Sequence, residues 1–456
     1  METIALLSHA VPHAIVAYRS GVAVTAQQFL DEANEAARRL PGCKHVLNVC
    51  ADRYRFTVGI AACLISKRVS LLPSTHTPQV IAHLKAFAPD AFCLTDDARC
   101  DIELPQIYYP DLFARPAAAA DREAPRFEVP RIAATQLAAV VFTSGTTGTP
   151  VPYRKTWGLL ARCVQNGAPR LGLLDGRSHT LVGTVPGQHM YGFESTVLLA
   201  LLSGNALSAE RPFYPADVAA AVREVPRPRV LVTTPIHLRT LLSSEVEFPP
   251  VDLVMSATAP LNGDLAREVE GKYGTRLLEI YGSTETGQIA MRRTAATATW
   301  RLWPGVRLSV VNERVFAQGG HVEQLTPMCD VIEITNEEEF ILHGRMADLV
   351  NVAGKRSSIG YLNAQLNAIP GVIDGAFFLR EESMGSTGVA RLGAVVVAPG
   401  MSVAGLTEEL RRLIDPVFLP RPLLIVEQLP RNATGKLPQQ ALQGFADAQL
   451  RISESQ

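Results

Sequence analysis

The sequence lacks a cysteine pattern, a long hydrophobic run and a signal-peptide pattern. Its seven cysteines form no Cys-x-x-Cys pair and have no histidine at metal-ligand spacing, which argues against a zinc site or a disulfide framework. Scattered cysteines in odd number are typical of reduced thiols in the cytoplasm, and we expect all seven to be buried. No run of about 18 apolar residues is free of charge and glycine, so no membrane span is expected. The N-terminus has no basic start followed by an apolar stretch, so no signal peptide is expected either.

An excess of charge of one sign is also missing. The 43 basic and 44 acidic residues give a net charge of -1, and the basic residues are dispersed along the chain. This balance does not indicate a surface that binds a polyanion, so we expect no nucleic-acid partner. With 456 residues, 47% of them hydrophobic, the chain is long enough for two or three hydrophobic cores.

Short apolar strands and amphipathic helices alternate over most of the chain. Between Thr25 and Leu40, apolar residues recur at helical spacing and predict a helix. The segment Ala114–Pro130 is rich in Ala, Pro, Arg and Glu and is predicted to be a linker. The alternation is typical of a layered α/β fold with a mainly parallel sheet. The predicted strands are His45–Val49, Val69–Leu72, Leu137–Phe142, Val230–Thr233, Leu253–Ser256 and Leu277–Tyr281, and further helices are predicted over Asp217–Glu224 and Asn262–Tyr273.

The character of the sequence changes after about residue 345. A basic loop leads into a tail with a predicted helix over Thr407–Ile414, a strand over Leu423–Val426 and a last helix from about Pro438. About 110 residues are enough for a small separate domain. We therefore predict a large N-terminal α/β core, residues 1–344, followed by a small α+β lid, residues 345–456.

A run of glycine and hydroxyl residues, TSGTTGTP, begins where one of the predicted strands ends. Its glycines let backbone N–H groups turn toward a bound anion, and its hydroxyl side chains add further donors. The run is not a Walker motif, because that motif requires a Gly-Lys-Ser/Thr ending. The residues expected to bind phosphate are Thr143, Ser144, Gly145, Thr146, Thr147 and Gly148.

Three more motifs follow in order: IYGSTE (Ile280–Glu285), HGRMADLVNVAGKR (His343–Arg356) and PRNATGK (Pro430–Lys436). Each one alone is compatible with an ordinary loop. Together with the glycine run they resemble the adenylate-forming superfamily, which includes acyl- and aryl-CoA synthetases, adenylation domains of peptide synthetases and luciferases. The resemblance covers nearly the whole chain. It implies ATP and Mg²⁺ as cofactors and a lid that moves relative to the core.

The resemblance also implies a role for individual residues. In IYGSTE, Tyr281 flanks the adenine, Thr284 hydrogen-bonds the α-phosphate and Glu285 binds Mg²⁺. A carboxylate is a suitable ligand for this hard cation. In PRNATGK, Lys436 bridges the substrate carboxylate and the α-phosphate and offsets charge as the new bond forms. Upstream, Ala257 lies in a small-residue loop that lets the nucleotide approach the backbone.

Two residues that bind the ribose hydroxyls are separated by a fixed interval in the superfamily. Asp330 and Arg345 stand at that interval here, although Pro327–Cys329 replaces the usual residues before the Asp. The lysine that usually follows the glycine run is replaced by Val151, and the sequence leaves open whether Lys155 substitutes for it. At the expected hinge the chain has Ala347 followed by Asp348, and either residue could absorb the rotation of the lid.

The segment VPGQHMYGFE resembles the part of the CoA ligases that ends at the acyl pocket. His189 matches a residue that gates the pocket and helps to orient the carboxylate, so we count it with the catalytic residues Lys436, Thr284 and Glu285. We predict that His189, Tyr191 and Phe193 line the pocket. Met190 stands where amino-acid-activating relatives carry an Asp, so an α-amino acid substrate is not expected.

These observations predict an ATP-dependent acid–thiol ligase. It would convert a carboxylic acid into an acyl-AMP, and our first choice for this acid is an aryl acid such as 3- or 4-hydroxybenzoate. It would then pass the acyl group to the phosphopantetheine thiol of an acyl carrier protein. The carrier protein is expected from a resemblance to ligases of xanthomonadin and aryl-polyene pigment pathways. One alternative is a ligase that uses free CoA with an aryl or medium-chain acid. Two others are a P-loop kinase or ATPase and a degenerate adenylate-binding regulator.

Overall fold

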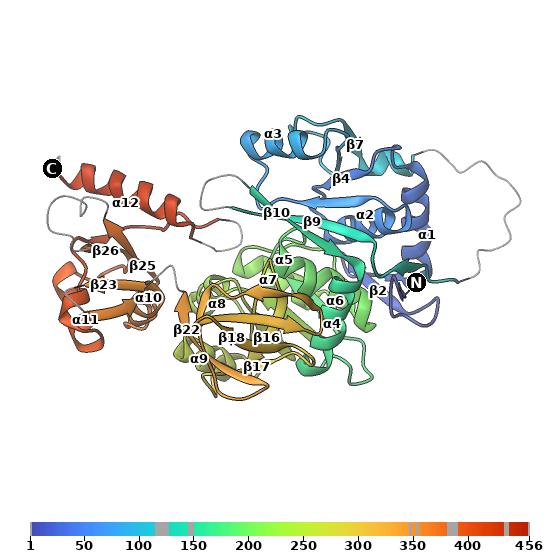
Figure 1. Ribbon diagram of the computed structural model, residues 1–456. Coiled ribbons are helices and arrows are strands. Elements are labelled where there is room, and N and C mark those ends of the chain that lie inside the picture. Colours follow the sequence, from blue (N-terminus) through green and yellow to red (C-terminus); the bar gives the residue numbers. More distant parts are fainter. Residues whose placement is uncertain are drawn as a thin grey trace, which may run out of the picture.

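The computed structural model describes residues 2–114, 127–144, 150–345, 349–352, 355–380, 391–432 and 437–454. Most of the chain forms a large layered α/β core, and the C-terminal part forms a smaller α+β unit beside it (Figure 1). The core and the lid bury separate hydrophobic clusters. Those of the core contain residues up to Phe340, and those of the lid contain residues from Val350 onward.

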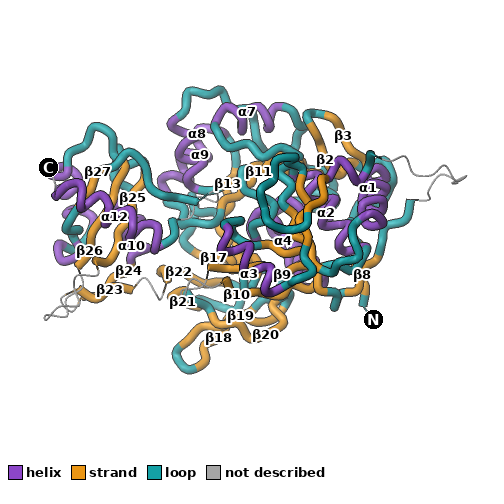
Figure 2. The backbone as a smooth tube through the Cα atoms, turned by 90° about the horizontal axis from the view of Figure 1, so that it is seen from above, coloured by secondary structure: helices purple, strands orange, loops and turns teal. Residues whose placement is uncertain are grey.

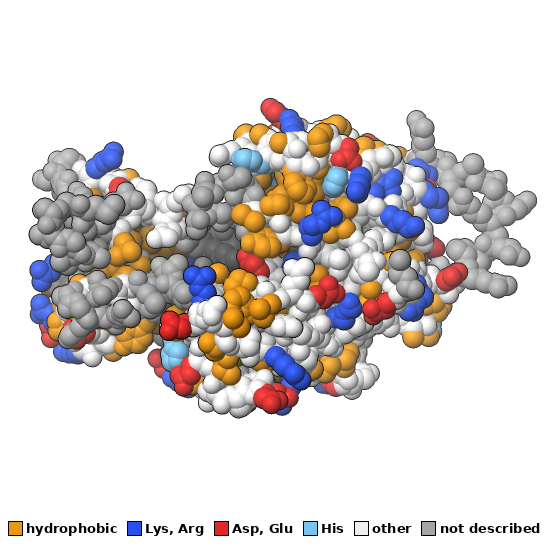
Figure 3. Space-filling view, in the orientation of Figure 1, with side chains coloured by type: hydrophobic (Ala, Val, Ile, Leu, Met, Phe, Trp, Pro, Cys, Tyr) orange, Lys and Arg blue, Asp and Glu red, His pale blue; other side chains and the backbone are white. Residues whose placement is uncertain are grey.

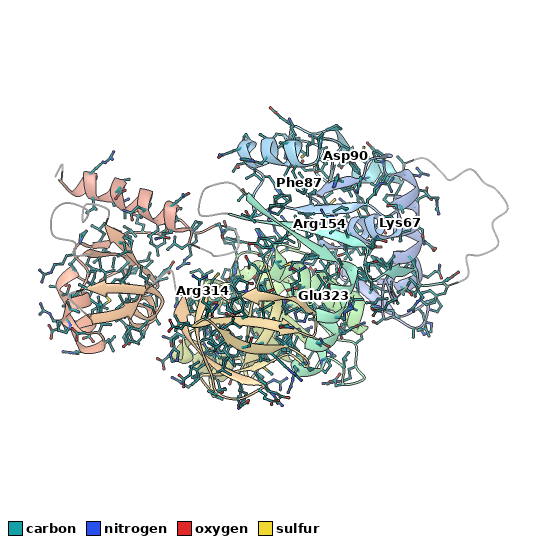
Figure 4. The ribbon with its side chains drawn as sticks, in the orientation of Figure 1. Lys67, Phe87, Asp90, Arg154, Arg314 and Glu323 are labelled. Carbon is teal, nitrogen blue, oxygen red and sulfur yellow. The ribbon has the colours of Figure 1, made fainter. Side chains whose placement is uncertain are left out.

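The first sheet of the core has six strands, and four of its neighbouring pairs are parallel. Two of its strands are buried at every position, because the layers of helices leave no face open to water. In spatial order the strands are β10 (Pro150–Thr156), β9 (Leu137–Ser144), β5 (Val69–Leu72), β4 (His45–Asn48), β6 (Phe92–Thr95) and β7 (Gln106–Tyr108). The ring of Phe87, which is labelled in Figure 4, packs edge-on against that of Phe142 on β9, with centroids 5.4 Å apart.

The second sheet has eleven strands and changes character half-way. From β2 to β15 the neighbouring strands are parallel, whereas from β15 to β21 they are antiparallel. The antiparallel half was not predicted from the sequence. In spatial order the strands are β21 (Asp330–Ile334), β22 (Glu339–Arg345), β17 (Thr299–Leu302), β16 (Gly287–Arg292), β15 (Arg276–Ser283), β14 (Leu253–Ser256), β13 (Arg229–Thr233), β11 (Thr180–Gly183), β12 (Ala206–Ser208), β2 (Ile15–Arg19) and β3 (Val22–Thr25).

Helices fill the space between the two sheets and cover the outer faces. Helix α2 (Arg53–Ile65) contacts β4 and β5 of the first sheet and β12 of the second, and it is buried on nearly all sides. Helix α1 (Ala26–Arg39) begins with a capping box in which Thr25 and Gln28 satisfy each other's backbone N–H groups. The other helices of the core are α3 (Pro78–Phe87), α4 (Trp157–Leu171), α5 (Met190–Gly192), the π-helical turn η2 (Phe193–Leu198), α6 (Leu199–Ser203), α7 (Pro215–Arg223), α8 (Pro235–Ser243) and α9 (Gly263–Tyr273).

Two small sheets complete the core. Strand β1 (Thr3–Ala5) pairs with β8 (Arg131–Ala133), and a separate three-stranded sheet lies in the chain between β17 and β21 of the eleven-stranded one. Its strands are β18 (Arg307–Val311), β19 (Arg314–Gly319) and β20 (Val322–Pro327). On the face of the molecule shown in Figure 3, basic and acidic side chains are interspersed.

The lid is built on a three-stranded sheet with helices on both faces (Figure 2). The clusters place α10 and α11 on one face and α12 on the other. A two-stranded ribbon precedes the sheet. The elements of the lid are β23 (Leu349–Val352), β24 (Lys355–Ser358), α10 (Ile359–Asn367), β25 (Asp374–Arg380), β26 (Arg391–Val397), α11 (Val403–Leu413), β27 (Leu423–Ile425) and α12 (Gln439–Glu454).

One charged contact joins the core to the lid. The Arg239 guanidinium on α8 donates to Asn367 Oδ1 at 3.3 Å and lies 3.9 Å from Asp374 Oδ1. Asp374 is buried and also accepts two hydrogen bonds from Arg431, at 2.6 and 2.7 Å. Because Arg431 belongs to the PRNATGK motif, this contact links the core to the segment that carries the predicted catalytic lysine.

One expectation from the sequence needs correction, and another cannot be compared with the described residues. All seven cysteines are free, but Cys329 is exposed and Cys43 and Cys100 are half-buried, so the expected burial of all seven is wrong. The predicted linker Ala114–Pro130 lies largely outside the described residues. Among the described helices, none is both long and apolar enough to cross a membrane.

Candidate active site

The glycine run connects two antiparallel strands of the first sheet. Strand β9 ends at Ser144, and β10 begins at Pro150 directly opposite it. Residues 145–149 lie outside the described residues, as do the side chains of Thr143 and Ser144. A Walker loop leads from a strand into a helix, whereas this loop leads from a strand into a strand. The connection therefore excludes the P-loop alternative.

The IYGSTE motif forms the end of β15 and the turn into β16. Ser283 and Thr286 hold the turn closed, because the backbone N–H of each donates to the hydroxyl of the other at 3.2 Å. Thr284 and Glu285 lie at the tip of the turn and are half-buried. A short turn of this kind projects both side chains from the end of a strand in the middle of the sheet.

The carboxyl group of Glu285 is held in its ionised form. Burial raises its pKa, but its own backbone, Ser283 and Tyr153 donate hydrogen bonds to it, and the nearby charge of Lys155 adds to their effect. Overall the pKa of Glu285 lies below its usual value. An ionised, half-buried carboxylate is the ligand that Mg²⁺ requires.

The structure brings the two predicted ribose residues together with the tyrosine of IYGSTE. Asp330 and Arg345 stand opposite each other in the antiparallel pair of β21 and β22. The Tyr281 hydroxyl donates a short hydrogen bond to the Asp330 carboxylate. The Tyr281 ring lies at a tilt to the rings of Trp300 and Phe340, with centroids 5.4 and 5.6 Å away. Nothing is described of the Arg345 side chain beyond its place in the strand.

Ala257 follows the neighbouring strand β14. In the register of this pair, Ser256 stands opposite Glu279, so Ala257 lies beside the last residues of β15. Thr258 has a φ of +77°, which marks a sharp change of direction after the strand. Ala257 and Tyr281 therefore lie at the ends of the neighbouring strands β14 and β15, where α/β sheets bind ligands, and the hydrogen bond from Tyr281 brings Asp330 of β21 to the same place.

The predicted acyl segment leaves β11 and enters α5 and η2. His189 caps α5 and is half-buried. The Tyr191 hydroxyl is buried, and this desolvation raises the pKa of Tyr191 well above its usual value. Phe193 is only 1% exposed and packs edge-on against Phe56, at 6.4 Å between centroids. Of the three predicted pocket residues, His189 and Tyr191 thus keep some exposed surface, whereas Phe193 belongs to the hydrophobic core.

Lys155 is buried beneath the turn of the IYGSTE motif. Its side chain is 6% exposed, and its Nζ donates to the backbone carbonyl of Glu285 at 3.0 Å. Two other predicted features, Lys436 and the hinge at Ala347 and Asp348, lie outside the described residues. The sequence did not reveal Glu194 either, a buried carboxyl close to Lys155. A single acidic residue inside the apolar run FESTVLLALL was the signal for it.

A family model described as AMP-binding enzyme matches residues 8–321. The chain belongs to this family. The predicted adenylate-forming ligase class is confirmed.

Curated relatives within the family activate aromatic acids, as their names state. A 4-coumarate–CoA ligase of Rhodobacter capsulatus is 33% identical over 273 residues, which cover 60% of this chain and 66% of that one. A 4-chlorobenzoate–CoA ligase of an Arthrobacter species is 26% identical over 376 residues, covering 71% and 68%. A solved structure of o-succinylbenzoate coenzyme A synthetase from Bacillus subtilis, in complex with ATP and magnesium ion, matches with a TM-score of 0.78 and 18% identity. It covers 95% of this chain and 97% of that one, which confirms the predicted fold class.

The described residues suit a magnesium ion that is shared with a nucleotide. The part of the chain that the structure describes holds no group of three or more His, Cys, Asp or Glu side chains able to hold a metal by themselves. Mg²⁺ commonly takes one or two protein carboxylates and completes its shell with phosphate oxygens and water. The Glu285 carboxylate fits this pattern.

Proposed function

We propose that this AMP-binding enzyme activates an aryl acid, such as 3- or 4-hydroxybenzoate, to an acyl-AMP and transfers the acyl group to a phosphopantetheine thiol. The observation that carries the nucleotide half of this proposal is the hydrogen bond from Tyr281 to Asp330, with Glu285 in the turn that directly follows the strand of Tyr281. In this proposal, Tyr281 flanks adenine, Asp330 and Arg345 bind the ribose, and Thr284 binds the α-phosphate. The glycine run, residues 143–148, holds the departing pyrophosphate.

In the first step an oxygen of the substrate carboxylate attacks the α-phosphorus of ATP. The bond between this phosphorus and the α,β-bridging oxygen breaks, and pyrophosphate leaves with that oxygen. The protein contributes position and charge, because the nucleophile comes with the substrate. Lys436 offsets the negative charge at the reacting phosphorus. Mg²⁺ bound at Glu285 would neutralise phosphate charge.

In the second step the thiol attacks the acyl carbon and AMP leaves. His189 stands between the acyl segment and the route by which the thiol arrives, and it orients the carboxylate. The aromatic character of Tyr191 suits a flat ring, and Met190 offers no charge for an α-ammonium group. The names of the two curated relatives support an aromatic acid.

For the acceptor we propose the phosphopantetheine of an acyl carrier protein in the cytoplasm, on the resemblance to pigment-pathway ligases. Free CoA is the second candidate, and the names of the relatives favour it. A degenerate regulator would bind the nucleotide without turnover.

A competition experiment tests the substrate and the acceptor together. Benzoate, 3- and 4-hydroxybenzoate, octanoate and phenylalanine are each supplied with CoA or with a phosphopantetheinylated carrier protein, and kcat/KM is compared. We expect the hydroxybenzoates and the carrier protein to give the highest values. A clear preference for octanoate would refute the aryl assignment, and efficient turnover with CoA would refute the carrier protein.

A further inference from the structure

A group of buried polar side chains lies directly beneath the turn that carries Glu285. They come from five segments that are far apart in the sequence: the end of β10, helix α4, turn η2, strand β16 and the loop between β19 and β20. All are at most 9% exposed, in an interior that is otherwise apolar. The members of this buried polar cluster are Lys155, Cys163, Glu194, Gln288 and His321.

The cluster touches the backbone of the turn on both sides of its tip. On one side, Lys155 Nζ donates to the carbonyl oxygen of Glu285 at 3.0 Å. On the other, Gly287 lies over the Glu194 carboxyl so closely that a Cβ atom there would come within 2.8 Å of Glu194 Oε1. Gly287 also has a φ of +72°, so both its backbone conformation and its close contact require glycine. The path of the turn is therefore set by groups beneath it.

Lys155 and Glu194 compensate each other's charge. Burial lowers the pKa of Lys155, and the negative charge of Glu194 opposes this effect. Burial likewise raises the pKa of Glu194, to about 7, and the positive charge of Lys155 opposes it. The Cys163 thiol adds a contact to Glu194 Oε1 at 3.4 Å, and Gln288 donates to the Ser195 hydroxyl at 2.7 Å. A buried charged pair is often replaceable by apolar side chains without loss of stability. Stability alone therefore does not explain why two charged side chains are buried beneath the turn of Glu285.

The cluster also connects two parts of the site. Glu194 comes directly after Phe193 and five residues after His189, in the segment proposed to bind the acyl group. Lys155 follows the glycine run on β10. The turn of Glu285 thus contacts one side chain from the proposed acyl segment, Glu194, and one from the strand that follows the glycine run, Lys155.

We propose that Lys155 and Glu194 are positioning residues that fix the turn of β15 and β16, so that the Glu285 carboxylate and the Thr284 hydroxyl face the bound Mg²⁺–ATP. This inference rests on the role proposed above for Glu285. Lys155 acts through the backbone carbonyl of Glu285, and Glu194 acts through its close approach to Gly287. Neither touches the nucleotide.

The test uses a variant in which both charges are removed together, Lys155→Met with Glu194→Met, because either single change would leave the other charge buried alone. A matched control is Lys272→Met, since Lys272 also donates to a backbone carbonyl, that of Leu242 at 2.8 Å, but on the exposed surface of α9. For each protein the melting temperature is measured alone, with ATP and EDTA, and with ATP and Mg²⁺. Carboxylate-dependent exchange of labelled pyrophosphate into ATP is then titrated with Mg²⁺.

We expect the double variant to fold and to keep the stabilisation by ATP in EDTA. It should lose at least about half of the additional stabilisation that Mg²⁺ gives, and need about tenfold more Mg²⁺ for half-maximal exchange, which is the lower end of the loss when a residue that orients a metal ligand is removed. The Lys272→Met control should behave as the wild type. A folded double variant with the wild-type response to Mg²⁺ would overturn the inference, and a double variant that cannot fold would reduce the cluster to a structural role. The wild-type protein could gain stability with Mg²⁺–ATP and yet show no pyrophosphate exchange with any of the supplied acids. In that case the proposed function fails, while the thermal measurements still decide the inference.

Discussion

In the core, the residues proposed to bind ATP lie on paired strands, whereas the lid meets the core through side chains. Asp330 and Arg345 face each other across a strand pair, and the Glu285 turn is closed by Ser283 and Thr286. The described contacts of the lid include that of Arg239 with Asn367 and Asp374 and that of the Ser358 hydroxyl with the His343 carbonyl. The comparison teaches that pairing within the core holds the residues proposed to bind ATP, whereas side-chain contacts are prominent where the lid meets the core.

The two regions also differ in their response to acid. All ten histidines of the chain precede residue 345, and two in the core, His237 and His321, are buried with pKa values lowered to about 4 by desolvation. The lid sequence has no histidine.

Acidification should therefore weaken the core and not the lid. A histidine with a lowered folded pKa binds its proton more readily when unfolded, so its full stabilisation is present above pH 6.5 and is lost as the pH falls toward 4. A shift of this size corresponds to about 3 kcal/mol for each histidine. Hydrogen exchange at pH 7, 5.5 and 4.5 should show opening of α8 and its neighbours before α10 and α11. His237→Gln should flatten this dependence and His13→Gln, at an exposed site, should not; equal opening of both regions would contradict the comparison.

Removing the lid lysine should affect one half-reaction. Lys436→Ala should lower the rate of acyl-AMP formation by at least about a hundredfold, the scale of one charge contact in a transition state. Formation of the thioester from supplied acyl-AMP should survive, and ATP affinity should change little. Both are measured by single-turnover kinetics, with Lys85→Ala as a surface control. A normal rate of acyl-AMP formation would make Lys436 a surface residue.

Changes within the core should instead act on the nucleotide. Asp330→Ala should raise the ATP concentration required for half-maximal exchange about tenfold, because a charged hydrogen-bonding group contributes about 1.5 kcal/mol. The exposed Asp264→Ala serves as control. Calorimetric titration of ATP separates this effect from catalysis, and equal ATP affinity in variant and wild type would remove the ribose assignment.

The smallest effect is expected at the contact between the two regions. Arg239→Ala removes the partly buried positive charge that lies beside the Asp374 carboxylate. Asp374 keeps Arg431 as its other partner. A contact of this kind is worth about 1 kcal/mol, so acyl-AMP formation should fall about fivefold while ATP binding by the core is unchanged. Arg223→Ala on α7 is the control. If both half-reactions and ATP binding fall together, Arg239 stabilises the core and does not dock the lid.

Local signals predicted the elements with strong internal patterns. The helix predicted between Thr25 and Leu40 is α1, since its apolar spacing and its capping box lie within the segment itself. Strands β5 and β14 were predicted with the observed bounds. The antiparallel strands between Gly287 and Arg345 were missed. Several of them, such as β18, are exposed, so they lack the continuous apolar run that marks a buried strand.

The candidate site residues could be predicted where they belong to a sequence motif. The side chains that contact them from other segments could not be predicted. The interval between Asp330 and Arg345 in the sequence corresponds to their pairing across β21 and β22. The length of a hairpin sets which residues of its two strands lie opposite each other. The bond from Tyr281 to Asp330 and the burial of Lys155 depend on contacts between segments about 50 and 130 residues apart. No local pattern encodes such contacts, so the sequence left the role of Lys155 open.

The measurement that most directly tests the central claim is the exchange of labelled pyrophosphate into ATP, with and without 4-hydroxybenzoate, in Mg²⁺ and in EDTA. An enzyme that joins a carboxylate to AMP must run this step backwards as well as forwards. We predict label in ATP only when both the acid and Mg²⁺ are present. ATP binding without exchange, for 4-hydroxybenzoate and for the other four acids of the competition experiment, would contradict the account. It would favour a degenerate adenylate-binding regulator.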